Sequence, residues 1–156
     1  MANHGFISSR KHFVKEQVIL DLQEINERRF KGLLKIEDSN WGKNGSWFIS
    51  YHINGQDYPV GFNIWIASKR KLEHRHSGMW AYYLEIVFSE ELGAKYNGIL
   101  SDEGHNNKWK PDPNKYDSYR SWLDELYSHI KKSNPNAYKK LTQFELKYAP
   151  LELRDC

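Results

Sequence analysis

The chain has 156 residues, a length that suits one domain and allows a sizeable hydrophobic core. Its 39% hydrophobic and 28% charged residues exclude the low-hydrophobicity composition that is typical of disordered chains. The one cysteine is Cys156, so a disulfide within the chain is excluded and a reducing compartment is expected. Because the apolar stretches are too short to cross a bilayer and the first residues lack the core of a secretion signal, we expect a cytoplasmic protein without membrane contact.

The formal net charge of +3 comes from one short segment. This basic segment, Ser68 to Ser77, contains one acid, Glu73, against four basic residues, Lys69, Arg70, Lys71 and Arg75, and the charges of the remaining chain balance. His74 and His76 add positive charge to it below about pH 6.5. The segment is therefore a candidate contact for phosphates.

The first predicted element is a helix from about His12 to Arg28, where Val14, Val18, Leu22 and Ile25 recur at helical spacing. Alternation of apolar and polar residues then predicts four strands, at Lys31–Glu37, Ser46–Ile53, Tyr58–Ala67 and Met79–Phe88. Asn54-Gly55 is a strong hairpin signal between the second and third strands. The basic segment would connect the third strand to the fourth.

The second half of the chain is predicted to be mostly helical. Ser89-Glu90-Glu91-Leu92 has the composition of a capped first helical turn, and Gly98 to Asn114 is rich in turn residues. Helical spacing resumes from Lys115 to Lys132, and Asn134-Pro135 opens a last helix that Pro150 closes. We therefore expect one α+β domain over residues 1–156, a four-stranded antiparallel β-meander packed by the N-terminal helix and two or three C-terminal helices.

One face of the predicted sheet mixes aromatic and polar residues, namely Phe48, His52, Asn63, Trp65, Tyr83 and Glu85, with Lys35 at an edge. Exposed aromatics beside cations favour binding surfaces, and they also suit stacking on unpaired bases. The alternative is that the C-terminal helices cover this face as a second core layer. Glu85 either acts as an acid or base with a raised pKa or pairs with Lys35, and the pairing is favoured.

His74-Arg75-His76 places two imidazoles on one side of an extended backbone, as a metal site needs. A third ligand would come from His52, His105, Asp102 or Glu103; the alternative is two solvated loop histidines. The spacing resembles the His-hydrophobic-His motif of rolling-circle Rep nucleases over three residues, with Arg75 in place of the apolar residue, and it is not adopted. Gly104-His105-Asn106-Asn107 suggests an HNH nuclease but lacks flanking strands, so a loop is favoured.

Candidate binding residues are Trp65, Tyr83, His52, Lys69, Arg70, Lys71 and Arg75, while His74, His76 and His105 are weak metal candidates. No catalytic residue and no cofactor is assigned, since neither a nucleophile elbow nor a phosphate-cradling glycine loop is present. We expect a non-enzymatic protein that recognises a macromolecule, with another protein as the favoured partner, of the toxin-immunity or phage-inhibitor type. Nucleic-acid binding through the basic segment and exposed aromatics is the alternative, and a metal-dependent nuclease or hydrolase comes third.

Overall fold

The computed structural model describes residues 4–53, 55–77, 79–103, 107–116 and 118–140. The chain divides into two compact units, Met1–Pro113 and Asn114–Cys156. The first unit contains a β-sheet and two α-helices, and the second contains helix α3 (Tyr119–Ser133) and further helical residues at 135–140. The expectation of one domain over the whole chain stays a prediction.

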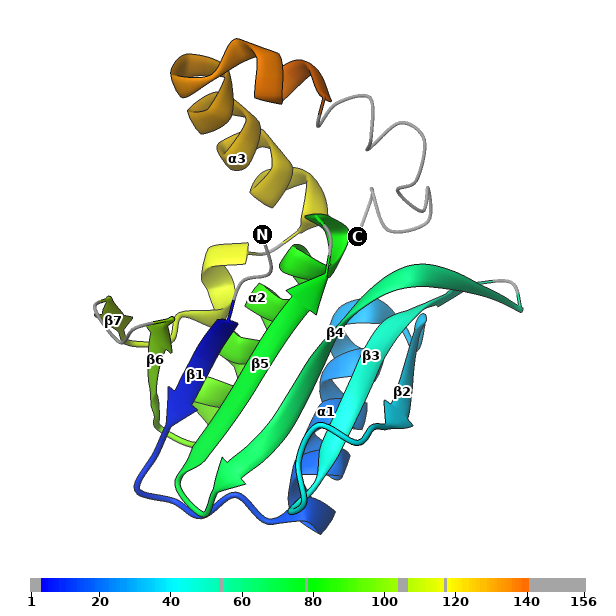
Figure 1. Cartoon of the computed structure of the whole chain (residues 1–156), viewed down its shortest axis with the longest axis vertical. Helices are drawn as coiled ribbons and strands as arrows, with labels where there is room; N and C mark the ends of the chain where they lie inside the picture. Colours follow the sequence, from blue (N-terminus) through cyan, green and yellow to red (C-terminus); the bar gives the residue numbers. More distant parts are fainter. Residues whose placement is uncertain (1–3, 54, 78, 104–106, 117, 141–156) are drawn as a thin grey trace. The chain divides into compact units, whose positions relative to one another are not determined.

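The first unit is built on an antiparallel sheet with the strand order β2-β3-β4-β5-β1-β6-β7 (Figure 1). Its strands are β1 (His4–Ser8), β2 (Leu34–Asp38), β3 (Ser46–Ile53), β4 (Gln56–Ser68), β5 (Lys71–Ser77), β6 (Ile99–Asp102) and β7 (Lys108–Trp109). The α+β class and the antiparallel sheet are thus confirmed. The four-stranded meander is wrong, because the described sheet has seven strands and only three of the four predicted strands belong to it.

The fourth predicted strand, Met79–Phe88, is instead the start of helix α2 (Met79–Lys95). Ala81, Leu84, Phe88 and Leu92 are all buried, and their spacing of three or four residues is that of one helix face. Because almost every side of the helix is buried, alternate positions of this segment are apolar as well. This alternation is the pattern of a strand, and it led to the wrong prediction. Ser89 therefore lies within α2 and does not begin a helix.

Helices α1 (Lys15–Phe30) and α2 pack on the same face of the sheet (Figure 1). Val18, Leu22 and Ile25 of α1 are fully buried, as the helical spacing in this segment predicted, and Phe30 at the end of the helix is buried as well. Val14 was predicted on the same face, but it lies at the N-cap of α1 and is 51% exposed. The strands contribute alternate residues to this core, among them Trp47, Ile49, Phe62, Ile64 and Leu72. Helix α2, which contains the predicted helical turn Ser89–Leu92, packs on the sheet beside α1. The packing of the sheet by the later predicted helices stays a prediction.

Three strands were missed because they are short. β1 lies inside the sheet, between β5 and β6 and antiparallel to both, although it contains only five residues. β6 and the two-residue β7 lie in the segment from Gly98 to Asn114 that was predicted to be a loop. A run of five residues or fewer shows too little alternation for its period to be recognised.

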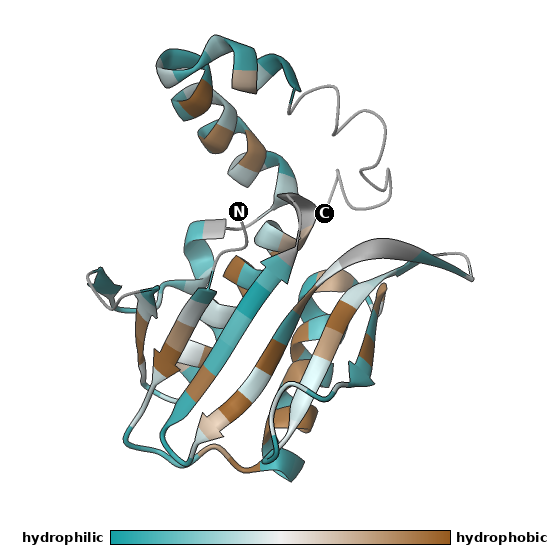
Figure 2. Cartoon of the chain, in the orientation of Figure 1, coloured by the Kyte–Doolittle hydropathy of each residue, from teal (hydrophilic) through white to brown (hydrophobic). Residues whose placement is uncertain are grey.

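The basic segment is mostly not a connection but strand β5, which follows a tight turn at Lys69-Arg70. It is visibly more hydrophilic than β3 and β4 (Figure 2). Because side chains alternate along a strand, His74 and His76 face the helices while Lys71, Glu73 and Arg75 face the other side. The sheet thus has a helix-covered face and a second face, here called the outer face, that carries these charges.

The main element of the second unit, as far as it is described, is helix α3. Ser118 caps α3, its hydroxyl oxygen accepting a hydrogen bond from the Ser121 backbone N–H at 3.1 Å. Tyr119, Trp122 and Leu123 are its buried residues. The predicted helix at Lys115–Lys132 is confirmed with a later start, and the part of the last predicted helix beyond residue 140 lies outside the described residues.

Within the part of the chain that is described, no helix has the length and apolarity needed to span a membrane.

Candidate functional site

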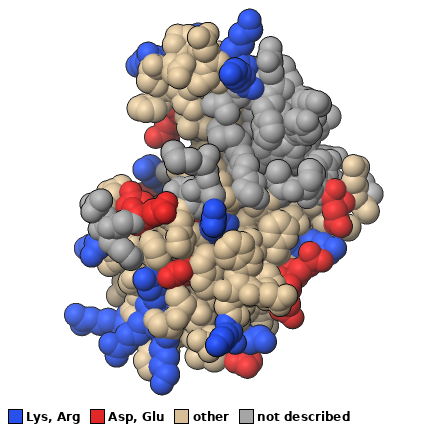
Figure 3. Space-filling view, viewed as in Figure 1, with Lys and Arg blue, Asp and Glu red and all other residues tan. Residues whose placement is uncertain are grey.

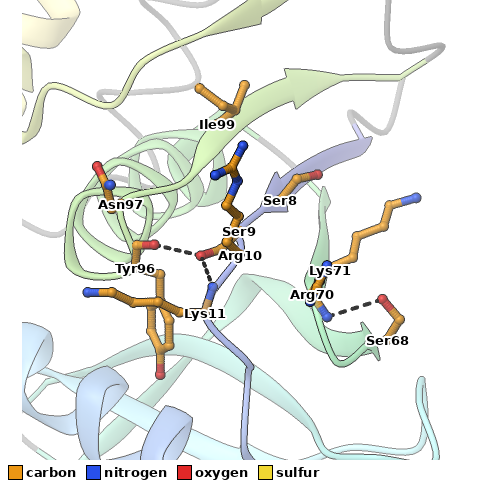
Figure 4. A pocket seen from close by; sticks show the side chains of 10 residues that line it. All are labelled: Ser8, Ser9, Arg10, Lys11, Ser68, Arg70, Lys71, Tyr96, Asn97 and Ile99. Carbon is orange, nitrogen blue, oxygen red and sulfur yellow. Dashed lines mark hydrogen bonds between the residues drawn. The ribbon is translucent and has the colours of Figure 1, made fainter.

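Cationic side chains line a hollow at one end of the sheet, where three segments of the chain meet (Figure 4). This basic pocket has a volume of about 730 Å³ and is lined by Ser8, Ser9, Arg10, Lys11, Ser68, Arg70, Lys71, Tyr96, Asn97 and Ile99. The first four residues end β1 and follow it, the next three form the β4–β5 turn, and the last three follow α2. The lining therefore has four cations and no acid.

Three of these cations lack a carboxylate partner in the described part of the chain. Arg10, Lys11 and Arg70 are exposed, and among the described residues none of them forms an ion pair. Lys71 differs because its Nζ lies 3.7 Å from Glu73 Oε1. The space-filling view shows the corresponding group of Lys and Arg side chains at lower left, without Asp or Glu among them (Figure 3). An anion at this place would meet three cations that no acid of the described residues neutralises.

Backbone hydrogen bonds hold the walls of the basic pocket together. The Ser9 N–H donates to the Arg70 carbonyl at 3.0 Å, and the Phe13 N–H donates to the Lys69 carbonyl at 2.7 Å. The Ser9 hydroxyl donates to the Tyr96 carbonyl at 2.6 Å, which connects the same segment to the end of α2 (Figure 4). The cations consequently extend from a fixed backbone frame, which lowers the entropic cost of binding.

The Tyr96 side chain belongs to this frame and is not a ligand group. Its hydroxyl donates to Asp21 Oδ2 of α1 at 2.6 Å, and its ring lies 4.5 Å from that of Phe13. Burial and the bond to the Asp21 carboxylate raise the pKa of the Tyr96 hydroxyl. Tyr96 therefore keeps its proton and supports the pocket wall.

The outer face of the sheet carries an aromatic group next to the basic pocket. The ring of Trp41, from the β2–β3 loop, lies 5.4 Å from that of Trp65 in β4, and the Arg75 guanidinium lies 5.8 Å from the Trp41 ring. Lys71 joins the two areas, since it lines the pocket and its Nζ lies 4.4 Å from the ring of Phe6 in β1. Trp65 is 9% exposed and Trp41 is 51% exposed, so Trp41 presents the open aromatic surface.

On the helix-covered face, two histidines of β5 share one carboxylate of α2. The Nδ1 of His74 lies 2.5 Å from Oε1 of Glu85, and the Nδ1 of His76 contacts Oε2. All three side chains are buried. Burial by itself would raise the pKa of Glu85, but the hydrogen bonds and charges of both histidines outweigh it and hold this pKa below its ordinary value. Glu85 is thus an ionised carboxylate in the core and does not pair with Lys35, which binds Glu37 and Asp57 instead.

This His–Glu–His cluster orients two imidazoles. When an Nδ1 hydrogen donates to the carboxylate, the ring keeps a lone pair on Nε2, which is the tautomer of histidines that accept a proton or bind a metal. Within the described ranges, however, no group of three or more His, Cys, Asp or Glu side chains can hold a metal ion. The interpretation of His74 and His76 as solvated loop residues is wrong, and His105 lies outside the described residues. The cluster connects β5 to α2.

Two other predicted site residues lie away from the aromatic group. Tyr83 is on α2, buried, with its ring edge-on to Phe30 at 6.1 Å, so its placement on the mixed sheet face is wrong. His52 lies exposed near the tip of the β3–β4 hairpin, where Nδ1 contacts Asp57 Oδ1 at 2.6 Å. Of the basic candidates, Arg70 and Lys71 meet in the pocket, whereas Lys69 does not line it and Arg75 lies on the outer face.

Arg10 and Lys11 complete the pocket, although sequence reasoning did not select them. They follow Ser8-Ser9 directly, a short polar run with two adjacent cations, and this run was the available signal. Comparisons of the chain with protein-family models, with curated proteins and with solved structures found no match. Function is therefore inferred from the chemistry of these residues.

Proposed function

We propose that the protein binds nucleic acid, with the phosphates of a single strand held in the basic pocket. The observation that carries this proposal is the gathering of Arg10, Lys11 and Arg70 around one hollow without a carboxylate partner among the described residues. Unpaired cations on a fixed frame release counterions from a phosphate backbone when they bind it, which is the main source of affinity for nucleic acids.

The neighbouring aromatic group supports a single strand as the ligand. Lys71 lies between the basic pocket and the outer face, and beyond it Trp41 offers a half-exposed indole with a guanidinium beside it. Unpaired bases stack on such rings, while cations nearby meet the phosphates between them. A strand with one phosphate in the pocket would extend across the outer face toward Trp41.

The test measures the binding of a labelled single-stranded oligonucleotide of about 16 nucleotides by fluorescence anisotropy over a range of salt concentrations. Replacing Arg10 and Arg70 by alanine should weaken binding at least about tenfold and reduce the salt slope by about two, roughly one for each lost phosphate contact. The matched control is Lys108→Ala with Lys110→Ala, which removes two exposed cations that do not line the pocket. Binding that is salt-insensitive, or that falls equally in both variants, would contradict the proposal.

A second candidate function is recognition of another protein through the outer face, the toxin-immunity or phage-inhibitor type that the sequence favoured. Its supporting observation is Trp41, which is 51% exposed beside Arg75, because tryptophan and arginine dominate binding energy at protein interfaces. Affinity capture from a native lysate should then return one dominant polypeptide. Trp41→Ala should release it, whereas Arg10→Ala with Arg70→Ala should not; the opposite result would favour the basic pocket.

A further inference from the structure

The charge in the basic pocket is larger than one internal phosphate group requires. Four cations line it, and among the residues that the structure describes only Lys71 lies near an acid, Glu73 at 3.7 Å. A phosphodiester within a strand has a single negative charge, whereas a terminal phosphate monoester has about −1.5 to −2 near neutral pH and three acceptor oxygens. Arg10, Lys11 and Arg70 therefore match the charge of a strand end better than that of a strand interior.

The polar groups of the lining have donors to spare for a phosphate with several oxygens. The Ser68 oxygen accepts from the Arg70 N–H at 3.4 Å, which leaves its hydroxyl hydrogen available. The Ser8 hydroxyl and the Asn97 amide add further donors to the same lining. Ser9 is excluded from this role because its hydrogen already binds the Tyr96 carbonyl.

The basic pocket has the size of a site for one small-molecule ligand, such as a nucleotide. Its volume of about 730 Å³ lies within the range of about 300–1,000 Å³ that is usual for pockets of small ligands. Ile99, 39% exposed in the lining, offers an apolar surface for the sugar or base that bears the phosphate. A terminal nucleotide has this combination of an anionic group and a weakly polar ring.

We propose that the basic pocket binds the terminal phosphate monoester of a single nucleic-acid strand. This inference rests on the proposed function and specifies which part of the strand the pocket holds. Arg10, Lys11 and Arg70 neutralise the terminal phosphate, Ser8 and Ser68 donate hydrogen bonds to its oxygens, and the following nucleotides leave the pocket past Lys71. The site distinguishes a phosphorylated end from a hydroxyl end.

The experiment compares three single-stranded oligonucleotides of identical sequence, one with hydroxyl groups at both ends, one with a 5′-phosphate and one with a 3′-phosphate. One of the phosphorylated strands should bind at least about tenfold more tightly than the unphosphorylated strand, because new charge-assisted hydrogen bonds form. Arg10→Ala with Arg70→Ala should remove this difference, and Lys108→Ala with Lys110→Ala should preserve it. The single variants Arg10→Gln and Arg70→Gln, with thermal unfolding curves like that of the parent, show that the loss is one of contact.

The outcomes separate this inference from the proposed function. If all three strands bind equally and the Arg10→Ala, Arg70→Ala variant weakens all of them, the preference for a terminal phosphate is overturned and the proposed function stands. If none of the strands binds, both are overturned. If a phosphorylated strand keeps its advantage in that variant, the advantage arises outside the basic pocket and the inference is overturned.

Discussion

Glu85 shows how one side chain can connect two elements of this fold. Its two carboxylate oxygens face the Nδ1 atoms of His74 and His76, so each oxygen satisfies one imidazole. Burial of a carboxylate destabilises the folded protein unless its oxygens accept hydrogen bonds, and here both oxygens do. The sequence could not predict this pairing, because Glu85 was placed on a strand and was expected to bind Lys35.

Glu85→Gln should destabilise the protein by about 1.5–3 kcal/mol, the range for hydrogen bonds to a charged group. The glutamine oxygen can accept from one histidine, but its NH₂ group then faces the Nδ1 hydrogen of the other. Urea unfolding gives the free energy of unfolding. The control Glu37→Gln alters an exposed ion pair with Lys35 and should cost less than about 0.5 kcal/mol. Equal stabilities of the two variants would contradict the role given to the His–Glu–His cluster.

The same carboxylate makes stability depend on pH in the acid range. The pKa of Glu85 is lower in the folded protein than its ordinary value of 4.5, so the unfolded chain takes up the proton first as the pH falls. The stabilisation is therefore complete above about pH 4.5 and is lost as the pH falls through the folded pKa. The difference in free energy of unfolding between the parent and Glu85→Gln should narrow below about pH 4.5. A constant difference down to about pH 3 would contradict the lowered pKa.

At the scale of elements, the sequence correctly predicted those strands and helices whose apolar residues recur with one clear period. The strand Ser46–Ile53 agrees residue for residue with β3, and the hairpin to β4 is present, because one face of these strands is buried and the alternation is clear. Helix α2 was missed for the opposite reason. It is buried on nearly all sides, so its apolar residues satisfy a period of two as well as a helical period.

The candidate site was predictable only in part, because it is made by tertiary structure. The basic segment was recognised from its composition, and Arg70 and Lys71 do line the pocket. Arg10 and Lys11 reach the same place because β1 pairs with β5, and a five-residue strand gives no sequence signal of that pairing. Charge density along the chain can therefore identify one wall of such a site but not the segment that lies opposite.

The pairing of β1 with β5 itself depends on a glycine. Gly5 lies opposite His74, and a Cβ at this position would lie 2.7 Å from Nε2 of that ring. Gly5→Ala should therefore displace the imidazole from Glu85 and cost about 1–3 kcal/mol, the usual range for overpacking. In urea unfolding, Gly5→Ala with His74→Ala should cost less than the sum of the single changes, by about 1 kcal/mol or more. Strict additivity would show that the ring does not restrict this position.

At the scale of the whole molecule, charge is distributed unevenly over the first unit. Where α1 meets α2, the cations are paired: Arg28 and Arg29 both bind Glu91, and Lys95 binds Asp21 and Glu24. In the basic pocket three cations have no such partner among the described residues. Paired charges hold the helices in place, whereas unpaired ones at a hollow are available to a ligand. The net charge of the chain is only +3, but the positive charge at the basic pocket is locally high.

All elements that build the basic pocket belong to the first compact unit, Met1–Pro113. This unit includes the seven described strands, α1 and α2, and its 113 residues lie within the usual size of a domain that folds alone. A fragment ending at Pro113 should therefore unfold in urea in one cooperative transition and bind the oligonucleotide within about threefold of the full chain, since the pocket and its frame are retained. Circular dichroism and anisotropy measure the two properties. If residues 1–156 instead form one indivisible domain, the fragment will show no cooperative transition. The two compact units would then not correspond to regions that fold independently.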